Sequence, residues 1–475
     1  MQNHRSELWK LGFTEMWERF GFYIWIDIMV YLLTEVFRFS ETASSSLYGK
    51  WTAAVYLAPL LGGYIADRYL GYRRAVLSGV LTLAAGYLLL AVAFYLRALS
   101  LVYGALAILV AGNGLFKPNM SAMIGNLYPA GDPRTDSAFS IFYQFVNGGA
   151  LLSPLVAASV RHHFSTPAAL VAAGAGLLLA VAGTIINWKH YAALDRASSL
   201  AAVTGVPLPP QFDDPPEDPA VERERIRAIV IVCLIVVAFW IAFHQNGSTL
   251  AFWAEKNTDL TLGGFLVAHP TLNRAMELVG WASKGQLDPV LFQAVNSLCI
   301  IFFTAPMLGL FAALERRGWA VPTPAKIGLG MALTAVTYGV MALAGYMGGD
   351  TGRVAAAWLV GGYALISAAE LCLSPMGLSL VTKLAPRRYV GLMLGVWYLT
   401  IALGSYLCGF VGRFWALWPH HTFFLFLVGI SLAPMGLLAL QYRRLLAVMP
   451  SAPAARPAPV PAPPALGLTL ETEAC

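Results

Sequence analysis

Hydrophobic residues fall along this chain in twelve runs, each long enough to cross a lipid bilayer. A bilayer-spanning helix needs about 20 predominantly apolar residues. Because lipid offers the peptide backbone no hydrogen-bond partners, segments of this kind fold as helices. The pattern therefore predicts an all-α membrane protein. The predicted helices cover residues 11–37, 46–66, 74–96, 100–127, 136–160, 168–188, 226–254, 289–314, 325–347, 354–384, 390–412 and 421–442.

A polar segment, residues 189–225, separates the first six runs from the last six. It is rich in Pro, Asp, Glu and Arg, a composition typical of a solvated linker. We therefore predict two six-helix bundles, residues 1–188 and 226–444, joined by a cytoplasmic linker. The Pro- and Ala-rich sequence that follows predicts a disordered cytoplasmic tail over residues 445–475.

Composition supports the membrane assignment. The 475 residues are 58% hydrophobic and 12% charged, whereas soluble domains carry about 25% charged residues. About 20 of the 31 Lys and Arg residues fall on the side of the N-terminus and about 9 on the other side. This asymmetry predicts a multi-pass protein of the plasma membrane with both termini in the cytoplasm. In a membrane protein a surplus of basic residues, here a net charge of +6, reflects the orientation of the chain in the bilayer. We therefore expect no nucleic-acid partner.

Motifs for catalysis or metal binding are missing from the sequence. No predicted span contains GxSxG, HExxH or GxGD, and no cysteine pair has the spacing of a metal site. Two pairs of adjacent histidines, at 162–163 and 420–421, lie in predicted loops without a third ligand. An intramembrane enzyme is therefore disfavoured, and we expect no metal or cofactor.

The first predicted helix carries three charges in the sequence GFTEMWERFGFY, residues 12–23. Each charge near the centre of a bilayer helix costs roughly 2.5–3.5 kcal/mol. The spacings of three and four residues place Glu15, Glu18 and Arg19 on one helix face. That face is expected to line a polar cavity or to pair with charges elsewhere. The simpler alternative is a structural Glu–Arg pair near the membrane interface.

Two further charges lie deep in predicted helices. Lys117 precedes Pro118 in the fourth span, and Glu370 lies in the tenth span with Ser374 one turn later. Together with the first-helix cluster they make three acids and two bases, whose formal charges sum to −1. A single proton would balance the set, which is a property that a proton-driven transport cycle requires.

Four segments resemble the proton-coupled oligopeptide transporters of the major facilitator superfamily. GFTEMWERFGFY is similar to the ExxER(F)xYY signature of that family. GGYIADRYLGYRRAV, GLFKPNMSAMIGNLY and AELCLSPMGLSLVTKLAPRRY resemble its second-, fourth- and tenth-helix segments, and the likeness covers nearly all of residues 8–444. The resemblance implies the fold of that superfamily, with twelve transmembrane helices in two six-helix halves.

The resemblance also implies roles for particular residues. The family's proton-coupling positions match Glu15, Glu18, Arg19 and Lys117. Its substrate cavity would receive the peptide carboxylate at a lysine, the amino group at an acid, and the peptide backbone at amides and phenols. The expected substrate-binding residues are Tyr23, Tyr56, Lys117, Asn147, His244, Asn296, Glu370, Ser374 and Trp397. Without the resemblance, the polar positions among them read equally well as ordinary helix packing.

The sequence departs from the family pattern at three places. The doubled tyrosine reads Phe22-Tyr23, the usual arginine is Ile26, and the usual acid of the seventh helix is His244. The arginine and the acid form a pair across the halves in many bacterial members. Loss of the arginine or the acid alone would leave the other charge buried without a partner. Because both are replaced here, no such unpaired charge remains, which indicates a functional variant. His244 is interpreted either as a neutral hydrogen-bonded imidazole or as a titrating group, with an unperturbed pKa of about 6.5.

Asp27 follows directly after the substituted arginine position. It is a further acid inside the first span. We interpret it as a structural residue that pairs with Lys50 near the outer end of the second span.

The function expected on these grounds is symport of di- and tripeptides with protons, by alternating access, with the proton as coupling ion and the bilayer as the only other partner. We expect the protein to work as a monomer. Two alternatives keep the same fold. One is transport of nitrate or another small anion or peptide-like solute, and the other is a nutrient-sensing receptor.

Overall fold

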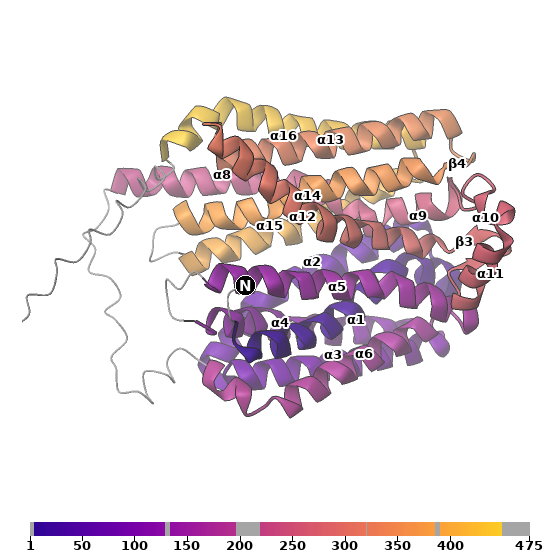
Figure 1. Cartoon of the computed structure of the whole chain (residues 1–475), viewed down its shortest axis with the longest axis horizontal. Helices are drawn as coiled ribbons and strands as arrows, with labels where there is room; N and C mark the ends of the chain where they lie inside the picture. The colour runs from indigo at the N-terminus through magenta and orange to yellow at the C-terminus, as the bar shows by residue number, and fades with distance from the viewer. Residues whose placement is uncertain (1–3, 129–133, 196–218, 320, 385–389, 449–475) are drawn as a thin grey trace, which may run out of the picture.

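The computed structural model describes residues 4–128, 134–195, 219–319, 321–384 and 390–448. Within these ranges the side chains of a few residues, Ser374 among them, are not described. The described part of the chain contains twelve long helices, which run roughly alongside one another (Figure 1). They are α1 (Ser6–Phe37), α2 (Glu41–Ile65), α3 (Tyr72–Tyr95), α4 (Leu99–Gly125), α5 (Arg134–His163), α6 (Ala168–Ile186), α8 (Pro219–Phe243), α12 (Gln293–Arg316), α13 (Thr323–Gly348), α14 (Ala356–Leu384), α15 (Val390–Val411) and α16 (His420–Val448).

These helices form two groups that match the two halves of the sequence. Helices α1 to α6 pack on one another mainly through the pairs α3–α4, α1–α5 and α1–α6. Helices α8 to α16 do so through α13–α16, α13–α14 and α8–α15. The groups meet chiefly where α2 packs on α15 and α5 packs on α12. In Figure 1 the first group lies below and the second above.

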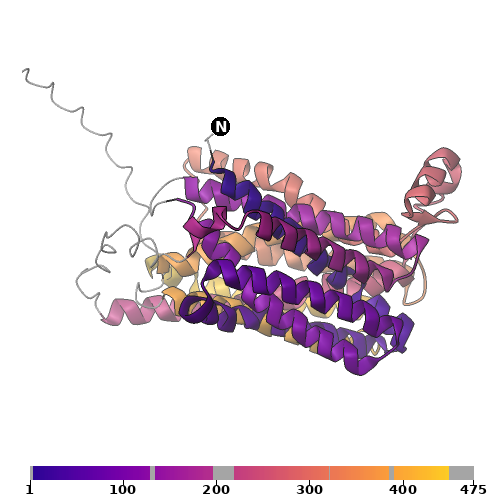
Figure 2. The ribbon, with the colours of Figure 1, turned by 90° about the horizontal axis from the view of Figure 1, so that it is seen from below.

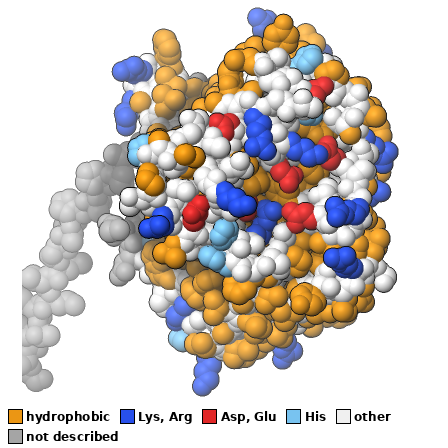
Figure 3. Space-filling model, turned by 90° about the vertical axis from the view of Figure 1, so that its right-hand side faces the viewer, with side chains coloured by type: hydrophobic (Ala, Val, Ile, Leu, Met, Phe, Trp, Pro, Cys, Tyr) orange, Lys and Arg blue, Asp and Glu red, His pale blue; other side chains and the backbone are white. Residues whose placement is uncertain are grey.

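Eleven helical segments in the described ranges are long and apolar enough to cross a membrane. The long helix that does not qualify is α2, whose first half carries three serines and Lys50. Large hydrophobic side chains such as Leu81, Leu178 and Leu343 are exposed on the sides of the bundle, as expected for a lipid-facing surface. Seen from one end, charged side chains of both signs gather near the centre while hydrophobic ones predominate round the rim (Figure 3).

Glycines let the helices approach closely. A Cβ atom at Gly62 in α2 would lie 1.9 Å from the backbone oxygen of Gly114 in α4. One at Gly49 would lie 2.6 Å from the backbone oxygen of Ser405 and 2.7 Å from Gly409, both in α15. Small residues at helix crossings are typical of membrane bundles. The second contact joins the two halves.

Short elements connect the long helices. The π-helical turn η1 (Ala66–Leu70) and the 3-10 helix η2 (His190–Leu194) lie at the end of the bundle that holds the chain termini. On the opposite side, β1 (Thr258–Asp259) pairs in parallel with β4 (Val354–Ala355), and β2 (Ala282–Ser283) pairs antiparallel with β3 (Gln286–Leu287). Helices α10 (Phe265–Ala268) and α11 (Pro270–Val279) stand out from that end of the molecule (Figure 2). The remaining short elements are η3 (His244–Gly247), α9 (Thr249–Lys256), η4 (Pro289–Phe292) and η6 (Gly412–Phe414).

The helix ends differ from the predicted spans where polar residues continue or interrupt a helix. Helix α8 begins at Pro219 rather than at residue 226, because the charged sequence VERERIR continues the helix beyond its apolar part. The same predicted span is broken after Phe243 by the polar turn η3, and α9 resumes after it. Helix α16 reaches Val448, past the predicted start of the tail at residue 445. Most of the predicted linker, at 196–218, and of the predicted tail, at 449–475, lies outside the described residues.

Candidate functional site

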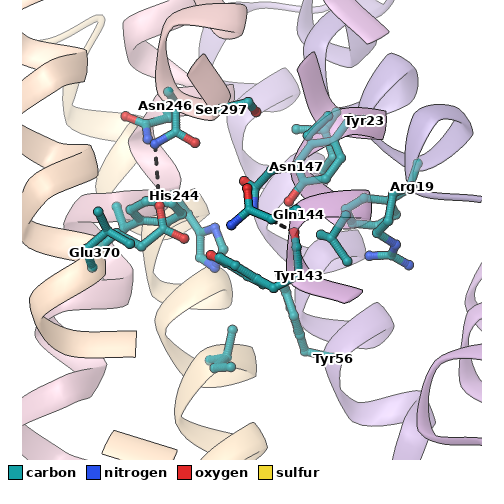
Figure 4. A pocket seen from close by; sticks show the side chains of 18 of the residues that line it. Arg19, Tyr23, Tyr56, Tyr143, Gln144, Asn147, His244, Asn246, Ser297 and Glu370 are labelled. Carbon is teal, nitrogen blue, oxygen red and sulfur yellow. Dashed lines mark hydrogen bonds between the residues drawn. The ribbon is translucent and has the colours of Figure 1, made fainter. Parts of the chain in front are cut away.

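A cavity of about 610 Å³ lies between the two halves. Its walls come from α1, α2, α4 and α5 on one side and from α8, η3, α12, α14 and α15 on the other. Of the predicted site residues whose side chains the structure describes, all except Glu18 line it: Glu15, Arg19, Tyr23, Tyr56, Lys117, Asn147, His244, Asn296, Glu370 and Trp397. Figure 4 shows the two walls facing each other, with Arg19, Tyr23 and Asn147 on one and His244 and Glu370 on the other.

Contacts between the halves close the cavity at the end away from the chain termini. Tyr31 in α1 donates a hydrogen bond to the backbone oxygen of Ala251 at 2.8 Å. Arg161 in α5 forms an ion pair with Asp288, just before η4, at 3.2 Å. Each contact joins a residue of the first half to one of the second. We call these two contacts, Tyr31 with Ala251 and Arg161 with Asp288, the outer closure.

The cavity opens toward the side of the chain termini. Its lining residues at this end, Phe139 in α5 and Leu308 in α12, are exposed. The same end holds the start of α5 and the end of α12 (Figure 1). If this side is the cytoplasm, as the distribution of basic residues predicts, the structure is open to the inside.

The charged cluster on α1 is buried and internally paired. Arg19 donates through Nε to Glu18 Oε2 at 2.5 Å and through a terminal nitrogen to Glu18 Oε1 at 2.8 Å. Glu15 lies 3.5 Å from the same guanidinium, and its Oε2 has no hydrogen-bond partner among the described residues. Bidentate pairing to one acid and contact with a second leave Arg19 fully neutralised. The structure thus brings the three charges of α1 into contact, with Glu15 and Arg19 but not Glu18 lining the cavity.

Lys117 and Glu370 line the cavity from opposite halves and form no direct pair with each other. The Lys117 ammonium lies 5.1 Å from the centre of the Tyr56 ring, a cation–π contact. Glu370 Oε2 instead accepts a hydrogen bond from Asn296 Nδ2 at 3.4 Å. Within the described residues no ion pair involves Lys117 or Glu370. Because the cavity separates the two walls, each charge is free to meet a bound molecule.

Amide and aromatic residues complete the walls. Asn147 donates through Nδ2 to the backbone oxygen of Tyr143 at 2.9 Å, which leaves its side-chain oxygen as an acceptor. Tyr23, Tyr56 and the buried Trp397 supply ring faces. The predicted site residue Ser374 lies outside the residues whose side chains the structure describes.

His244 occupies an aromatic part of the cavity. Its ring stacks on Trp240, with centroids 5.6 Å apart and planes inclined by 24°, and lies 5.9 Å from the Tyr56 ring. Its Nε2 is buried and has no hydrogen-bond partner within the described part of the chain. We had considered a neutral imidazole held by hydrogen bonds. At Nε2 the structure shows no such bond with a described residue.

Asp27 is placed differently from our expectation. It does not pair with Lys50, which is exposed. Instead its Oδ2 accepts a hydrogen bond of 2.6 Å from Ser153 Oγ in α5, and the residue lines the cavity. The partner lies 126 residues away in the sequence, so spacing could not reveal it.

Sequence reasoning missed other polar residues of the lining. Tyr143 and Gln144 in α5 and Asn246 in η3 face the cavity (Figure 4), and Gln293 opens α12 beside it. The signal was available, because Gln144 lies one turn before Asn147 and Asn246 belongs to a polar run inside an apolar span. Polar residues that interrupt an apolar span are candidates for cavity lining.

Comparison with protein-family models gives a match to a model described as the POT family, over residues 73–204 and 217–421. The chain belongs to the POT family. These are the proton-dependent oligopeptide transporters of the major facilitator superfamily, so this POT chain is a multi-pass membrane transporter rather than an enzyme. The family and fold predicted from the four sequence motifs are confirmed.

Related sequences agree with this assignment. The POT chain is 29% identical over 441 residues to dipeptide and tripeptide permease B of Edwardsiella piscicida, which covers 85% of each chain. It is 29% identical over 439 residues to dipeptide and tripeptide permease A of Salmonella typhimurium, covering 85% of this chain and 82% of that one. It is 28% identical to the uncharacterized transporter YclF of Bacillus subtilis, over 92% and 93% of the two chains.

Solved structures are similar over the whole bundle. A peptide transporter POT in complex with sulfate superposes with a TM-score of 0.79 at 26% identity, covering 93% of this chain and 95% of that one. A variant of a peptide transporter POT in complex with alafosfalin gives a TM-score of 0.80 at 27% identity, covering 94% and 96%. The arrangement of two six-helix halves is shared with these transporters.

Proposed function

We propose that this POT protein is a proton-coupled symporter of di- and tripeptides that works by alternating access. It would lie in the cytoplasmic membrane with both termini inside, so that the cavity described here opens to the cytoplasm. A peptide and protons would enter when the outer closure is broken and leave in the present conformation. The names of the permeases that the chain resembles support peptides as the substrate class.

The observation that carries the proposal is a cavity with opposite charges on its two walls. Lys117 projects from the N-terminal half and Glu370 from the C-terminal half, and neither forms an ion pair with any other residue that the structure describes. A zwitterion can meet both, with its carboxylate at Lys117 and its amino group at Glu370. The volume of about 610 Å³ falls in the range of sites for small molecules, about 300–1,000 Å³. Because the two charges lie on different halves, bound peptide would draw the halves together.

Proton coupling is assigned to the cluster on α1. Arg19 is held by Glu18 and faces Glu15, whose free oxygen is the simplest place for a proton to bind. Protonation of either acid weakens its hold on the guanidinium, and Arg19 then competes for the remaining carboxylates. Lys117 lines the same cavity from α4, so a change of charge in the cluster alters the field at the substrate carboxylate. Proton binding and peptide binding are linked in this way.

Transport of a small anion such as nitrate fits the cavity less well. Among the described residues, the lining carries the acids Glu15, Asp27 and Glu370 and the bases Arg19 and Lys117, and His244 adds a positive charge only when its imidazole is protonated. Arg19 is already neutralised within its cluster. A small anion would therefore meet more negative than positive charge.

The test is uptake of labelled dialanine into liposomes that contain the purified protein. We expect uptake to require an inwardly directed proton gradient, to be inhibited by excess unlabelled dipeptide, and to be unaffected by the same concentration of nitrate. Lys117→Ala protein provides the matched control and should show little uptake. Displacement of dialanine by nitrate would favour the anion transporter. Binding of dipeptide with no uptake in either direction would favour the receptor.

A further inference from the structure

Asp27 is a buried acid for which the described part of the site provides no basic partner. It is only 4% exposed and lines the cavity from α1. Its one hydrogen bond comes from Ser153 Oγ to Oδ2, and no ion pair involves it within the described part of the chain. A buried carboxylate without a basic partner carries a desolvation cost of several kcal/mol. One hydroxyl compensates for only part of that cost.

Arg19 on α1 and Arg161 on α5 are both paired with acids other than Asp27. Arg19 lies eight residues earlier on α1, about 12 Å along the helix axis, and is held by Glu18 and Glu15. Arg161 belongs to the outer closure, where it pairs with Asp288 and Glu35. Lys117, another base of the lining, contacts the Tyr56 ring, and no ion pair joins it to Asp27 within the described residues. Asp27 is therefore neutralised either by a proton or by a positively charged group of a bound molecule.

Asn246 presents a second unused acceptor in the same part of the cavity. Its side-chain oxygen Oδ1 is buried and has no hydrogen-bond partner among the described residues. Its backbone oxygen is already taken, by Gln293 Nε2 at 2.9 Å and the Tyr363 hydroxyl at 3.4 Å. Figure 4 shows Asn246 on the wall opposite Asn147. A ligand that fits here is one that donates hydrogen bonds.

The two acceptors lie just inside the outer closure. Tyr31, one helical turn after Asp27, donates to the backbone oxygen of Ala251, five residues after Asn246. Helix α1 also packs directly against η3, which holds Asn246. Asp27 and Asn246 thus come from the two halves to the closed, deep end of the cavity, away from its mouth.

We propose that this deep end is a subsite for a positively charged side chain of the transported peptide, with Asp27 as the counter-charge and Asn246 as a second acceptor. An ammonium carries three donors and no acceptor, and a guanidinium carries five donors. Either group matches the carboxylate of Asp27 and the unused side-chain oxygen of Asn246. Tyr48 and Tyr23, which line the cavity beside Asp27, supply surface for the aliphatic stem of such a side chain. The inference rests on the proposed peptide transport and extends it to side-chain selectivity.

The experiment compares two peptides that differ only in the charge at the end of one side chain. Alanyl-lysine and alanyl-norleucine compete against labelled dialanine for uptake into liposomes, in wild-type protein and in Asp27→Asn. The substitution keeps the size and the hydrogen bond from Ser153 but removes the charge. We expect wild type to prefer alanyl-lysine and the ratio of the two affinities to fall by about tenfold or more in the variant, as hydrogen bonds to charged groups imply. Ser153→Ala, which keeps the charge, should retain the preference for lysine.

The outcomes separate this inference from the proposed function. If wild type takes up dialanine but the affinity ratio is the same in wild type and Asp27→Asn, the subsite is overturned and peptide transport stands. If Asp27→Asn loses proton-driven accumulation of all peptides equally, Asp27 is a proton site rather than a side-chain subsite. If wild type takes up none of the peptides, the proposed function itself is wrong. For a variant with poor uptake, the shift in Tm of the purified protein with each peptide gives the same ratio.

Discussion

The outer closure offers a direct test of alternating access, through the ion pair between Arg161 and Asp288. Arg161 lies in α5 of the first half, and its guanidinium contacts Asp288 of the second half at 3.2 Å. It also contacts Glu35 at 3.2 Å, within the first half. If the two halves separate at this end to admit substrate, the pair to Asp288 must break. The substitution Arg161→Met keeps much of the aliphatic stem and removes the pair.

The size of the effect follows from burial. The Arg161 and Asp288 side chains are 12% and 18% exposed. Exposed pairs contribute about 0–1 kcal/mol, and breaking a fully buried one costs about 3–5 kcal/mol. This pair lies between those limits, so its loss should destabilise the closed outer end by about 1–3 kcal/mol. The population open to the outside should then rise by about 5- to 150-fold.

The assay is labelling of the Ser45→Cys variant by a membrane-impermeant maleimide from outside, with the five native cysteines replaced by alanine. Ser45 and Ser248 are fully buried between the halves, where Ser248 donates a hydrogen bond to Ser45 at 2.8 Å. The labelling rate reports the open fraction. Lys256→Met is the control, because Lys256 also pairs across the halves, with Glu41, but is 56% exposed. An unchanged rate in Arg161→Met, or an equal rise in Lys256→Met, would refute the reasoning.

Three further predictions concern the cavity. Glu18→Gln should abolish gradient-driven accumulation while peptide-for-peptide exchange survives better, because Arg19 loses its bidentate charged partner; full accumulation would exclude this role. Glu370→Ala should weaken dialanine uptake far more than uptake of its N-acetylated form, and equal losses would count against an amino-group contact. His244→Gln should leave the pH dependence of peptide affinity between about pH 5 and 8 unchanged, because the buried ring stacks on Trp240, where the charged imidazole is disfavoured; competition uptake measures this, and a flattened profile would show that His244 titrates. His244→Glu should be harmful alone but recover with Ile26→Arg. A double variant no better than the single one would show that these two positions do not act together.

The long helices could be predicted because apolar length is a local property of the sequence. The predicted spans agree with the helices except where polar residues are involved. Helix α8 includes a charged first part that hydropathy alone would leave outside the helix. The turn at His244 divides a segment that hydropathy alone predicts as one helix. The elements between residues 258 and 288 are short, at most the ten residues of α11, so the hydrophobic pattern does not distinguish them from loop.

The α1 cluster could be predicted for a related reason. Charges inside a membrane helix are costly, and residues three and four apart share a face, so Glu15, Glu18 and Arg19 had to meet. The partners of Asp27 and Glu370 could not be predicted this way. Ser153 and Asn296 reach them through the packing of distant helices. The absence of a direct pair between Lys117 and Glu370 depends on how far the halves stand apart, which no single-sequence pattern records.

The most direct test of the central claim is the steady-state accumulation of labelled dialanine as a function of the imposed pH difference. A difference of one pH unit is worth about 1.36 kcal/mol per proton, so a symporter moving one proton per peptide accumulates substrate up to about tenfold per unit. We predict that the internal concentration exceeds the external one, rises with the pH difference, and returns to equality when a proton ionophore is added. Equal concentrations on both sides at every pH difference would contradict proton-coupled peptide transport.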